Sequence, residues 1–244
     1  MLFAFACNNA DKKEESTETK TDTAATAETV QPVQQDATPD AIKAAPDLYK
    51  VLSDSAGIRI VEVTYKPGDS SALHSHGDYA VYATSGGTTT FYGKDGTKVE
   101  SEMKTGTTYV RGAEVHSVKN TGKTTVKAIL VEVSRPAQTT TQDAATDATK
   151  VASDVYKSKA DSLGIRVLTV TAKPGKSIAM HAHPDAALYM LEGGTVEFTN
   201  KDGSKQVREL PKGVAAVLPA ESHGAKNTGK TTFKAILVEV NRAK

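Results

Sequence analysis

The sequence predicts an all-β protein made of two similar small barrels or sandwiches in tandem. Three observations support this fold class: an internal repeat without gaps, many short segments rich in β-branched residues that end at turn residues, and no sustained apolar period of 3.6 residues outside the terminal and linking segments. The chain has 244 residues, which is enough for two domains of modest size.

Two parts of the chain are copies of one another. Residues 57–135 align with residues 164–242 at a constant offset of 107, and 44 of the 79 paired residues are identical. The copies close with nearly the same sequence, KNTGKTTVKAILVEV and KNTGKTTFKAILVEV. A tandem duplication of one domain of about 80–90 residues explains this self-similarity. We therefore expect a first barrel over residues 47–136 and a second over residues 153–244.

Each copy has the sequence pattern of short strands joined by tight turns. The first strands read IRIVEVTYKPG and IRVLTVTAKPG, in which β-branched residues lead into Pro-Gly turns at residues 67–68 and 174–175. Asp-Gly pairs at residues 95–96 and 202–203 lie between strand-like segments, which is typical of β-hairpins. Turns at intervals of about 8–12 residues are characteristic of sandwiches and barrels.

The segments outside the copies are polar. Residues 8–46 and 137–152 are rich in Thr, Ala, Asp, Glu and Lys and have few large apolar side chains. Such segments cannot bury enough surface to offset their chain entropy. We expect a disordered N-terminal linker over residues 8–46 and a second linker, between the barrels, over residues 137–152.

The first residues resemble a bacterial lipoprotein signal. Residues 1–7 read MLFAFAC, an apolar start that leads to the only cysteine, Cys7, and is followed by a polar tract. In lipoproteins the signal peptide is removed before the cysteine, which then carries lipid. The apolar run is shorter than the ~7–15 residues of an ordinary signal and has no basic residue before it, which a start site placed too late would explain. The resemblance implies export to the periplasm or cell envelope with a lipid anchor; the alternative is a tail with an incidental cysteine.

Composition excludes several classes of function. Lys and Arg number 30 against 29 for Asp and Glu, so the chain lacks the basic excess of a duplex-binding protein. It has no Trp and few aromatic residues, which argues against stacking of single-stranded nucleic acid. No apolar run reaches the ~20 residues needed to span a bilayer. We expect no nucleic-acid partner and contact with a membrane only through the lipid anchor.

The six histidines form one pattern that occurs twice. They are His74, His76 and His116 in the first copy and His181, His183 and His223 in the second. Residues two apart on a strand point the same way, so each His-x-His aims two imidazoles at one face of a sheet. The third histidine follows 40 residues later and comes from another strand. Three convergent imidazoles suit Fe²⁺, Zn²⁺, Cu²⁺ or Ni²⁺. The alternative is packed imidazoles that bind backbone carbonyls.

These motifs resemble those of the cupin superfamily. GDSSALHSHGDYAVYATSGG and GKSIAMHAHPDAALYMLEGG are similar to its first motif, and GTTYVRGAEVHSVKN and GVAAVLPAESHGAKN to its second. The resemblance covers both copies, roughly two-thirds of the chain. It implies a bicupin, with two antiparallel jelly-roll barrels that each hold a metal ion. It also implies that Asn120 and Asn227, at the end of the second motif, have conformational rather than ligating roles.

The chain departs from the family pattern at one ligand. The resemblance implies a glutamate as fourth ligand a few residues after His-x-His, where this sequence has Ala80 and Ala187. Both alanines share the strand parity of the histidines, so we expect them to face the site and to leave coordination positions open, as catalytic metals require. The resemblance implies a precedent, because some cupin dioxygenases hold Fe(II) with three histidines alone. A weakened site kept only for binding is the alternative.

Two further pairs of residues are candidates for catalysis. Glu114 and Glu221 lie two residues before the third histidines, so each is a candidate fourth ligand, orienter of an imidazole, or general base. The alternative is a glutamate that faces solvent in a turn. Tyr82 and Tyr189 keep the parity of His-x-His and are candidates to donate a hydroxyl hydrogen bond inside the barrel; the alternative is packing.

The expected function is that of an exported metal-binding bicupin with a three-histidine site in each barrel. The resemblance suggests a non-haem-iron dioxygenase or an isomerase that acts on a small organic molecule, with Fe²⁺ as the metal and Zn²⁺, Cu²⁺, Ni²⁺ or Mn²⁺ as further candidates. The alternative is a non-catalytic envelope lipoprotein that binds a metal or a small ligand. A third hypothesis, a structural protein with stabilising sites, is disfavoured by retention of both histidine sets. Oligomeric state is beyond the sequence.

Overall fold

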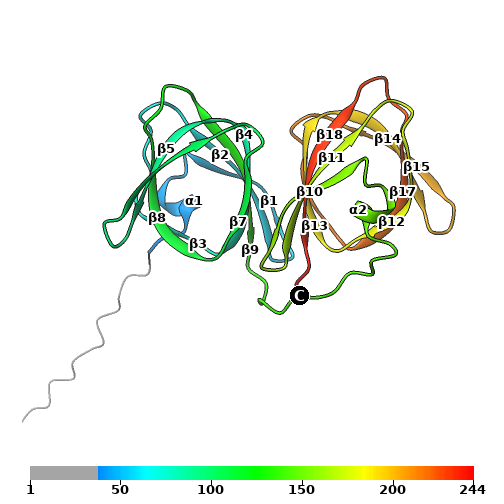
Figure 1. The fold of residues 1–244 in the computed structure, drawn as a ribbon, viewed down its shortest axis with the longest axis horizontal. Helices are drawn as coiled ribbons and strands as arrows, with labels where there is room; N and C mark the ends of the chain where they lie inside the picture. The colour runs from blue at the N-terminus through cyan, green and yellow to red at the C-terminus, as the bar shows by residue number, and fades with distance from the viewer. Residues whose placement is uncertain (1–37) are drawn as a thin grey trace, which may run out of the picture. The chain divides into compact units, whose positions relative to one another are not determined.

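The computed structural model describes residues 38–244 and contains two similar all-β barrels, each with one short helix (Figure 1). Cys7 and the expectations for the lipid anchor and for most of the N-terminal linker lie outside the described residues. Each barrel consists of two antiparallel sheets.

Nine strands form the first barrel. They are β1 (Tyr49–Ser55), β2 (Ile58–Tyr65), β3 (His74–His76), β4 (Asp78–Ser85), β5 (Gly87–Gly93), β6 (Lys98–Met103), β7 (Thr108–Arg111), β8 (Glu114–Asn120) and β9 (Val126–Val133). One sheet has the order β1-β2-β9-β4-β7 and the other has the order β3-β8-β5-β6. Some neighbouring strands, such as β2 and β9, are far apart in sequence, and the chain between them passes through the other sheet. The two sheets therefore enclose one core.

The second barrel repeats this arrangement strand for strand. Its strands are β10 (Tyr156–Ser162), β11 (Ile165–Ala172), β12 (Ser177–His183), β13 (Ala186–Glu192), β14 (Gly194–Asn200), β15 (Lys205–Leu210), β16 (Ala215–Leu218), β17 (Glu221–Asn227) and β18 (Phe233–Val240). The sheet orders are β10-β11-β18-β13-β16 and β12-β17-β14-β15. The all-β class and the two-barrel organisation expected from the duplication are therefore confirmed.

Alternation along the strands places one apolar core inside each barrel. In β9, for example, Val126, Ala128 and Leu130 face the interior, where Met103 and Val118 of the opposite sheet complete the same buried cluster. The equivalent cluster of the second barrel includes Phe233, Ala235 and Leu237 of β18. Both sheets of each barrel thus exclude water from a shared interior.

Short helices precede the first strand of each barrel, where the sequence analysis places linkers. α1 (Ala41–Ala44) and α2 (Ala148–Val151) are capped by the carboxylates of Asp40 and Asp147, and their first alanines are buried in the barrel cores. The repeat continues upstream to these aspartates at the same offset of 107. The predicted linkers over residues 8–46 and 137–152 are therefore wrong for α1 and α2, which belong to the barrels. These segments mix alanine with polar residues and therefore resemble linkers, but the small alanine side chains can be buried against a barrel.

Outward-facing residues of the two five-stranded sheets join in one apolar cluster between the barrels. Its buried members are Ile58, Ile60, Ala80, Ile129, Val131 and Val133, together with the residues 107 positions later, Ile165, Val167, Ala187, Ile236, Val238 and Val240. Two ion pairs flank the cluster reciprocally. Arg135 Nη2 donates to Asp185 Oδ2 at 2.6 Å, and Arg242 Nη2 donates to Asp78 Oδ2 at 2.6 Å. Identical surfaces thus meet as in a two-fold symmetric dimer.

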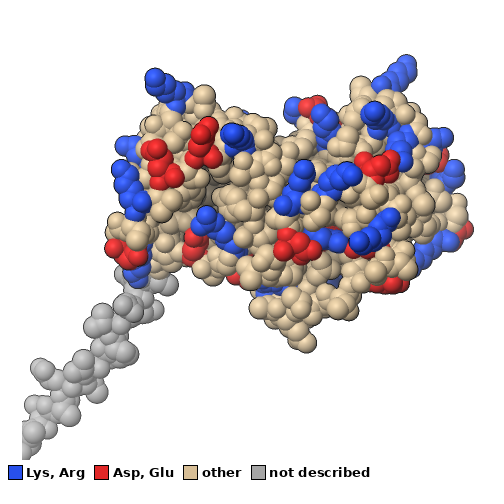
Figure 2. Space-filling model, viewed as in Figure 1, with Lys and Arg blue, Asp and Glu red and all other residues tan. Residues whose placement is uncertain are grey.

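Charges of both signs are mixed over the face of the protein shown in Figure 2, in agreement with the balanced composition. Among residues 38–244, the helices are too short to cross a lipid bilayer.

We predict that Asp185→Asn destabilises the protein by about 3 kcal/mol at neutral pH, because it leaves the buried Arg135 guanidinium without its anion. Burial raises the pKa of Asp185, but hydrogen bonds from Arg135 and Lys244 outweigh it and hold the pKa below its usual value. The carboxylate therefore stabilises the fold above the pKa of the unfolded chain, and this contribution is lost as the pH falls through the lower, folded pKa.

Urea denaturation measures this change in the free energy of unfolding. The difference between the two proteins is expected to be large at pH 7 and to narrow as the pH falls below 3.8, the ordinary pKa of Asp. The exposed Asp161→Asn is the control and should change stability little. Equal stability of Asp185→Asn and the parent at pH 7 would contradict the assigned ion pair.

Candidate metal centres

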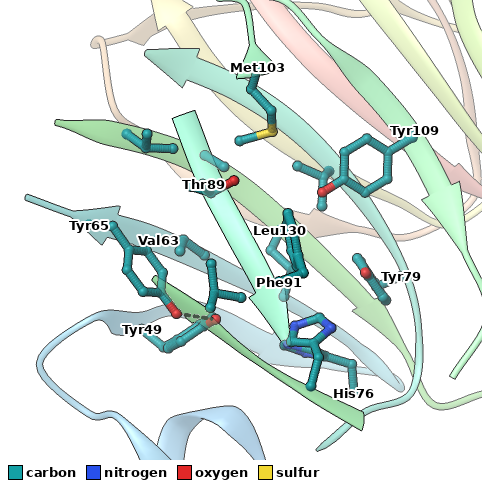
Figure 3. Close-up of a pocket in the computed structure, with 15 residues that line it drawn as sticks. Tyr49, Val63, Tyr65, His76, Tyr79, Thr89, Phe91, Met103, Tyr109 and Leu130 are labelled. Atoms are coloured by element: carbon teal, nitrogen blue, oxygen red, sulfur yellow. Dashed lines mark hydrogen bonds between the residues drawn. The ribbon is translucent and has the colours of Figure 1, made fainter. Parts of the chain in front are cut away.

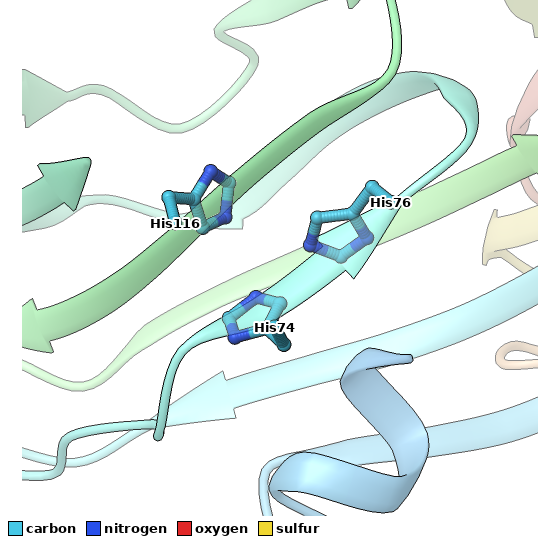
Figure 4. Close-up of side chains that lie close together, drawn as sticks. All are labelled: His74, His76 and His116. Carbon is cyan, nitrogen blue, oxygen red and sulfur yellow. The ribbon is translucent and has the colours of Figure 1, made fainter. Parts of the chain in front are cut away.

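Antiparallel pairing brings the first three histidines together. β3 carries His74 and His76, and its register with β8 sets His74 directly opposite His116. The ring centroids are 4.8 Å apart for His74 and His76, 4.9 Å for His74 and His116, and 5.1 Å for His76 and His116. Figure 4 shows the three rings facing one another. All three side chains are buried, and one nitrogen from each lies within 4.8 Å of the others.

The second barrel builds the same group. His181 of β12 is opposite His223 of β17, and His183 lies two residues further along β12. The ring centroids are 4.7 to 5.5 Å apart, and all three residues are buried. The structure therefore confirms that the six histidines converge in two sets of three.

Two rings in each set are held in a defined orientation. Nδ1 of His74 lies 2.8 Å from the carbonyl oxygen of Ala72, to which it donates. Nδ1 of His76 lies 2.7 Å from Oε1 of Glu132 and donates to that carboxylate. The corresponding distances are 2.8 Å for His181 and Ala179 and 2.6 Å for His183 and Glu239. Because Nδ1 carries the proton in these rings, the lone pair is on Nε2; in His74 and His181 a tyrosine hydroxyl lies beside this atom and would give way to a bound cation.

The chemistry of this donor set fits a transition metal ion. Burial lowers the pKa of His74 to about 4 and that of His181 to about 4, so both rings are neutral at pH 7. Nδ1 of His223 is buried and has no hydrogen-bond partner among the described residues. A shared ion at ~2.1 Å from each nitrogen requires nitrogens about 3–3.5 Å apart, so binding would draw the rings slightly closer. The residues present can hold an ion with three neutral ligands.

A chain of charged side chains, in which Glu132 is buried and Arg59 and Asp40 are half-buried, supports the His76 ring. Glu132 lies at the end of the inward-facing row of β9, and its Oε2 accepts a hydrogen bond of 2.7 Å from Nε of Arg59. Arg59 also pairs with Asp40, the residue that caps α1. The second barrel repeats this network with Glu239, Arg166 and Asp147. The network fixes the carboxylate and, through it, the orientation of the imidazole.

Glu132 and Glu239 are not among the site residues predicted from the sequence. Both lie in the KAILVEV segments, where every residue is identical between the copies, so repetition could not distinguish a glutamate that supports a ligand from its neighbours. A charged residue in the interior-facing row of a strand was the available signal, because such residues are rarely buried without a partner.

A buried tyrosine lies against each triad. The hydroxyl of Tyr49 lies 3.2 Å from Nε2 of His74, and the hydroxyl of Tyr156 lies 3.0 Å from Nε2 of His181. Burial raises the pKa of both tyrosines, so they are neutral hydrogen-bond donors at neutral pH. The aligned repeat began after them, and extending it upstream at the same offset would have found this identical pair.

Glu114 and Glu221 lie beside the third histidines and outside the group of ligand atoms. Oε1 of Glu114 lies 3.3 Å from Nδ1 of His116, and Oε1 of Glu221 lies 3.0 Å from Nδ1 of His223, although the latter geometry is not that of a hydrogen bond. Interaction with the His116 ring, and then with the Tyr79 hydroxyl, lowers the pKa of Glu114 to about 2. Interaction with His223 likewise lowers the pKa of Glu221. The position suits a partner that orients an imidazole or a base that accepts a proton.

Tyr82 and Tyr189 do not point into the barrels, and neither do Ala80 and Ala187. All four belong to the apolar cluster between the barrels, so the expectation that they face the metal is wrong. Gly77 and Pro184 separate each His-x-His from the following strand, which belongs to the other sheet, and side-chain parity does not carry across this corner.

Inward-facing residues of β4 and β13 nevertheless leave the site without a carboxylate from this strand. They are Tyr79, Val81 and Ala83 in the first barrel and Ala186, Leu188 and Met190 in the second. None of these inward-facing residues is a glutamate, but they are not the alanines that the sequence predicted to face the site.

Asn120 and Asn227 lie away from the ligand atoms and tie the chain together. Nδ2 of Asn120 donates to the carbonyl oxygens of Tyr65 and Thr124, each at 2.8 Å. Asn227 makes the equivalent bonds to Ala172 and Thr231. The conformational role expected for both asparagines is confirmed.

A cavity extends from each triad into the barrel, and the two cavities differ in size. The first is about 60 Å³ and includes His76 and His116 in its lining, and a separate hollow of about 510 Å³ lies on the surface beside His116 and Glu114. The second is about 360 Å³ and includes His183 and Glu221, together with the counterparts of residues that line the surface hollow of the first barrel. Tyrosine and phenylalanine rings crowd the first cavity around His76 (Figure 3).

Solved structures of oxalate decarboxylases are similar to the chain in fold. A formate complex of the Lactobacillus farciminis enzyme aligns over 78% of this chain and 78% of its own, with a TM-score of 0.53 and 14% identity. The Bacillus subtilis enzyme at pH 4.6 aligns over 83% of this chain and 71% of its own, with a TM-score of 0.55 and 14% identity. A structure from work on the Mn(II) centres of the same enzyme aligns over 84% and 72%, with a TM-score of 0.53 and 12% identity.

Comparison of the sequence alone finds no relative: no protein-family model matches the chain, and no curated protein matches it. The structural likeness shows that the chain has the cupin fold, with two jelly-roll barrels in tandem, which confirms the expected fold class.

We predict that Glu239→Gln lowers the affinity of the second barrel for a divalent metal ion by about 10- to 100-fold. The substitution removes the charge that holds the His183 ring in its ligating orientation. Titration of metal-free protein with Zn²⁺, followed by calorimetry, measures the two affinities, and Glu132→Gln should weaken the other site.

The exposed Glu209→Gln on β15 serves as the control and should leave both affinities unchanged. Circular dichroism establishes that each variant is folded. A folded Glu239→Gln variant with unaltered Zn²⁺ affinity would show that the carboxylate does not support the ligand.

Proposed function

We propose that this protein binds one divalent transition metal ion in each barrel and that it acts, through a bound metal, on a small organic molecule. The observation that carries the proposal is the pair of buried histidine triads, each with three ring nitrogens within 4.8 Å of one another. Divergence elsewhere supports a role for them, because 35 of the 79 aligned positions differ (79 minus 44) while all six histidines are retained.

We propose Fe²⁺ as the metal because the proposed reaction is of the dioxygenase type; the donor set by itself suits Fe²⁺, Zn²⁺, Cu²⁺ and Ni²⁺ alike. Imidazole nitrogens suit Fe, Zn, Cu and Ni, whereas Mn²⁺ prefers carboxylate and water oxygens. Mn²⁺ is nevertheless a candidate, because the B. subtilis oxalate decarboxylase with the same fold has Mn(II) centres. Three neutral ligands leave the ion its full positive charge and leave positions for a substrate.

The reaction class that we propose is that of a metal-dependent oxidoreductase of the dioxygenase type, with isomerisation as the alternative reaction. A bound ion supplies a Lewis acid that polarises an oxygen of the substrate. Glu221 lines the cavity beside His223 and places a carboxylate at the rim of the triad, within reach of a molecule in the cavity, where it can serve as a proton acceptor. The hydroxyl of Tyr156 can donate a hydrogen bond to a group held beside His181.

A non-catalytic protein that binds a metal and a small ligand is the second candidate. It is favoured by the first barrel, whose interior cavity of about 60 Å³ is too small for an organic molecule, while the hollow of about 510 Å³ beside His116 and Glu114 lies at the surface and half of its lining residues are exposed. In that barrel both Tyr79 and Arg111 contact Glu114, so the carboxylate is already engaged by the protein.

We further propose that the protein is exported to the periplasm or cell envelope and carries a lipid anchor on Cys7. The support is the resemblance of residues 1–7 to a lipobox and the polar tract that follows. Expression in a bacterium should yield membrane-associated protein whose N-terminal peptide has the mass of a lipid-modified cysteine. The Cys7→Ser variant should lose both properties, and unmodified Cys7 in the parent would contradict the anchor.

Elemental analysis of the full chain, purified without oxygen, tests metal binding. We predict two metal ions per chain, one ion after His116→Ala or His223→Ala, and none after both substitutions, because each triad loses a ligand. Tyr82→Phe and Tyr189→Phe are the controls, since both tyrosines face away from the triads and should leave two ions bound.

A parent chain that binds no ion, or histidine variants that retain both, would overturn the proposal. Oxygen uptake by the Fe²⁺-loaded protein then separates the two candidate functions. Catechols, hydroxybenzoates, diketones and thiols are the trial substrates, and oxalate is added with formate as the measured product because enzymes of the same fold act on it. Metal binding without turnover of any of them would favour the non-catalytic candidate.

A further inference from the structure

The two barrel interiors have diverged although their metal ligands have not. In the first barrel the interior cavity beside the triad is about 60 Å³, and a separate hollow of about 510 Å³ lies at the surface beside His116 and Glu114. In the second barrel one cavity of about 360 Å³ includes both the interior and the counterparts of that hollow. Ligand sites that enclose a small organic molecule are typically ~300–1,000 Å³, and the second barrel reaches that range with a cavity that extends into its interior.

Three substitutions account for the difference. Tyr65, Tyr79 and Tyr109 line the first cavity and fill it with aromatic rings (Figure 3). At the positions 107 residues later the second barrel has alanine in every case, at Ala172, Ala186 and Ala216. Loss of three phenol rings opens the interior, and the larger Leu188 and Met190 that replace Val81 and Ala83 return only part of that volume.

The walls of the second cavity are apolar. Aliphatic and aromatic side chains from both sheets line it, among them Val170, Leu188, Met190, Phe198 and Phe233. Its polar groups are few, namely Tyr156, His183, Asn200, Gln206, Arg208 and Glu221. This lining fits a molecule with a largely apolar body and one polar end.

Arg208 places a positive charge at the polar end of the cavity. Its guanidinium lies 5.7 Å from the centre of the Phe198 ring, which in turn lies 5.2 Å from the ring of His223. Its side chain donates to Oε1 of Gln206, at 2.7 Å from Nη2, and lies near Glu221, whose negative charge it partly offsets. The first barrel has Ser101 at this position. Arg111 of the first barrel lies at the separate surface hollow and stacks on Tyr109, whereas Arg208 lines the cavity that extends into the interior of its barrel.

The carboxylate beside the triad is also less engaged in the second barrel. Tyr79 and Arg111, which contact Glu114, are replaced by Ala186 and Leu218, and the side chain of Glu221 is 46% exposed against 30% for Glu114. With a divalent ion bound by neutral imidazoles, the positive charges of the ion, Arg208 and Arg166 outweigh the negative charges of Glu221, Glu239 and Asp147. The interior then favours an anion.

We propose that the second barrel alone is the organic-ligand site and that it takes a largely apolar organic anion of the size of a one- or two-ring aromatic acid. The inference rests on the proposed function for the metal and adds the class of ligand and the barrel that binds it. The apolar body packs among the Leu, Met, Val and Phe side chains, and the acid group lies near Arg208 and the metal site. The first barrel holds its metal ligands in a filled interior.

Calorimetric titration of the Zn²⁺-loaded full chain with 2-naphthoate tests the proposal. We expect one molecule bound per chain, and weaker binding of the neutral analogue 2-naphthylmethanol and of acetate and oxalate, which lack the apolar body. Arg208→Gln should weaken 2-naphthoate at least tenfold and change 2-naphthylmethanol little. Lys205→Gln is the matched control, because Lys205 lies on the same strand but outside the cavity lining.

A graded series at Ala216 tests the location. Ala216→Val, Ala216→Leu and Ala216→Tyr progressively restore the volume that Tyr109 occupies in the first barrel, so affinity for 2-naphthoate should fall in that order. The smaller substitutions report on the site if the tyrosine variant does not fold. Undiminished affinity through the folded members of the series, two molecules bound per chain, equal affinity for the neutral analogue, or no binding of 2-naphthoate would each overturn the proposal.

Metal content is measured on the same samples, which separates this proposal from the proposed function. Loss of 2-naphthoate binding with two ions retained would overturn the ligand class alone. Binding of 2-naphthoate by a chain that retains no metal would leave the ligand class standing and overturn the metal-dependent function.

Discussion

Antiparallel register between the His-x-His strand and the strand of the third histidine is the constraint on which both candidate sites depend. Backbone hydrogen bonds place His74 opposite His116 and His181 opposite His223, and the pleat returns the second histidine of each pair to the same face. A shift of one residue would send the imidazoles to the outside of the barrel. The buried, neutral character of the rings follows from this placement, and so does their capacity to bind a cation.

The surrounding network turns that placement into a defined donor set. Glu132 and Glu239 accept from one histidine of each set and are themselves held by arginines that pair with the capping aspartates of α1 and α2. The short helices before each barrel thus belong to the support of the site. Removing a carboxylate here frees a ring and also leaves a half-buried guanidinium with only one of its two carboxylate partners.

Duplication followed by divergence explains why the barrels match at some surfaces and differ inside. Every buried residue of the cluster between the barrels has its counterpart in the same cluster, and the flanking ion pairs are reciprocal. The interior of the second barrel has lost three tyrosines and has Arg208 beside Phe198. The shared contact surface keeps both barrels under the same packing constraint, whereas a cavity can change without unfolding its barrel when the substitutions remain apolar.

The sequence by itself determined the duplication, the all-β class and the six histidines, because repetition and strand alternation are local properties that can be counted along the chain. It also indicated that no carboxylate follows His-x-His toward the site. Only the tertiary structure decided which side chains face the metal. The corners at Gly77 and Pro184 move the chain from one sheet to the other, so Tyr82 and Tyr189 turn outward while Tyr79 and Ala186 turn inward. The structure alone likewise revealed Glu132, Glu239, Tyr49 and Tyr156 as partners of the histidines and the unequal cavities, because these depend on contacts between residues far apart in sequence.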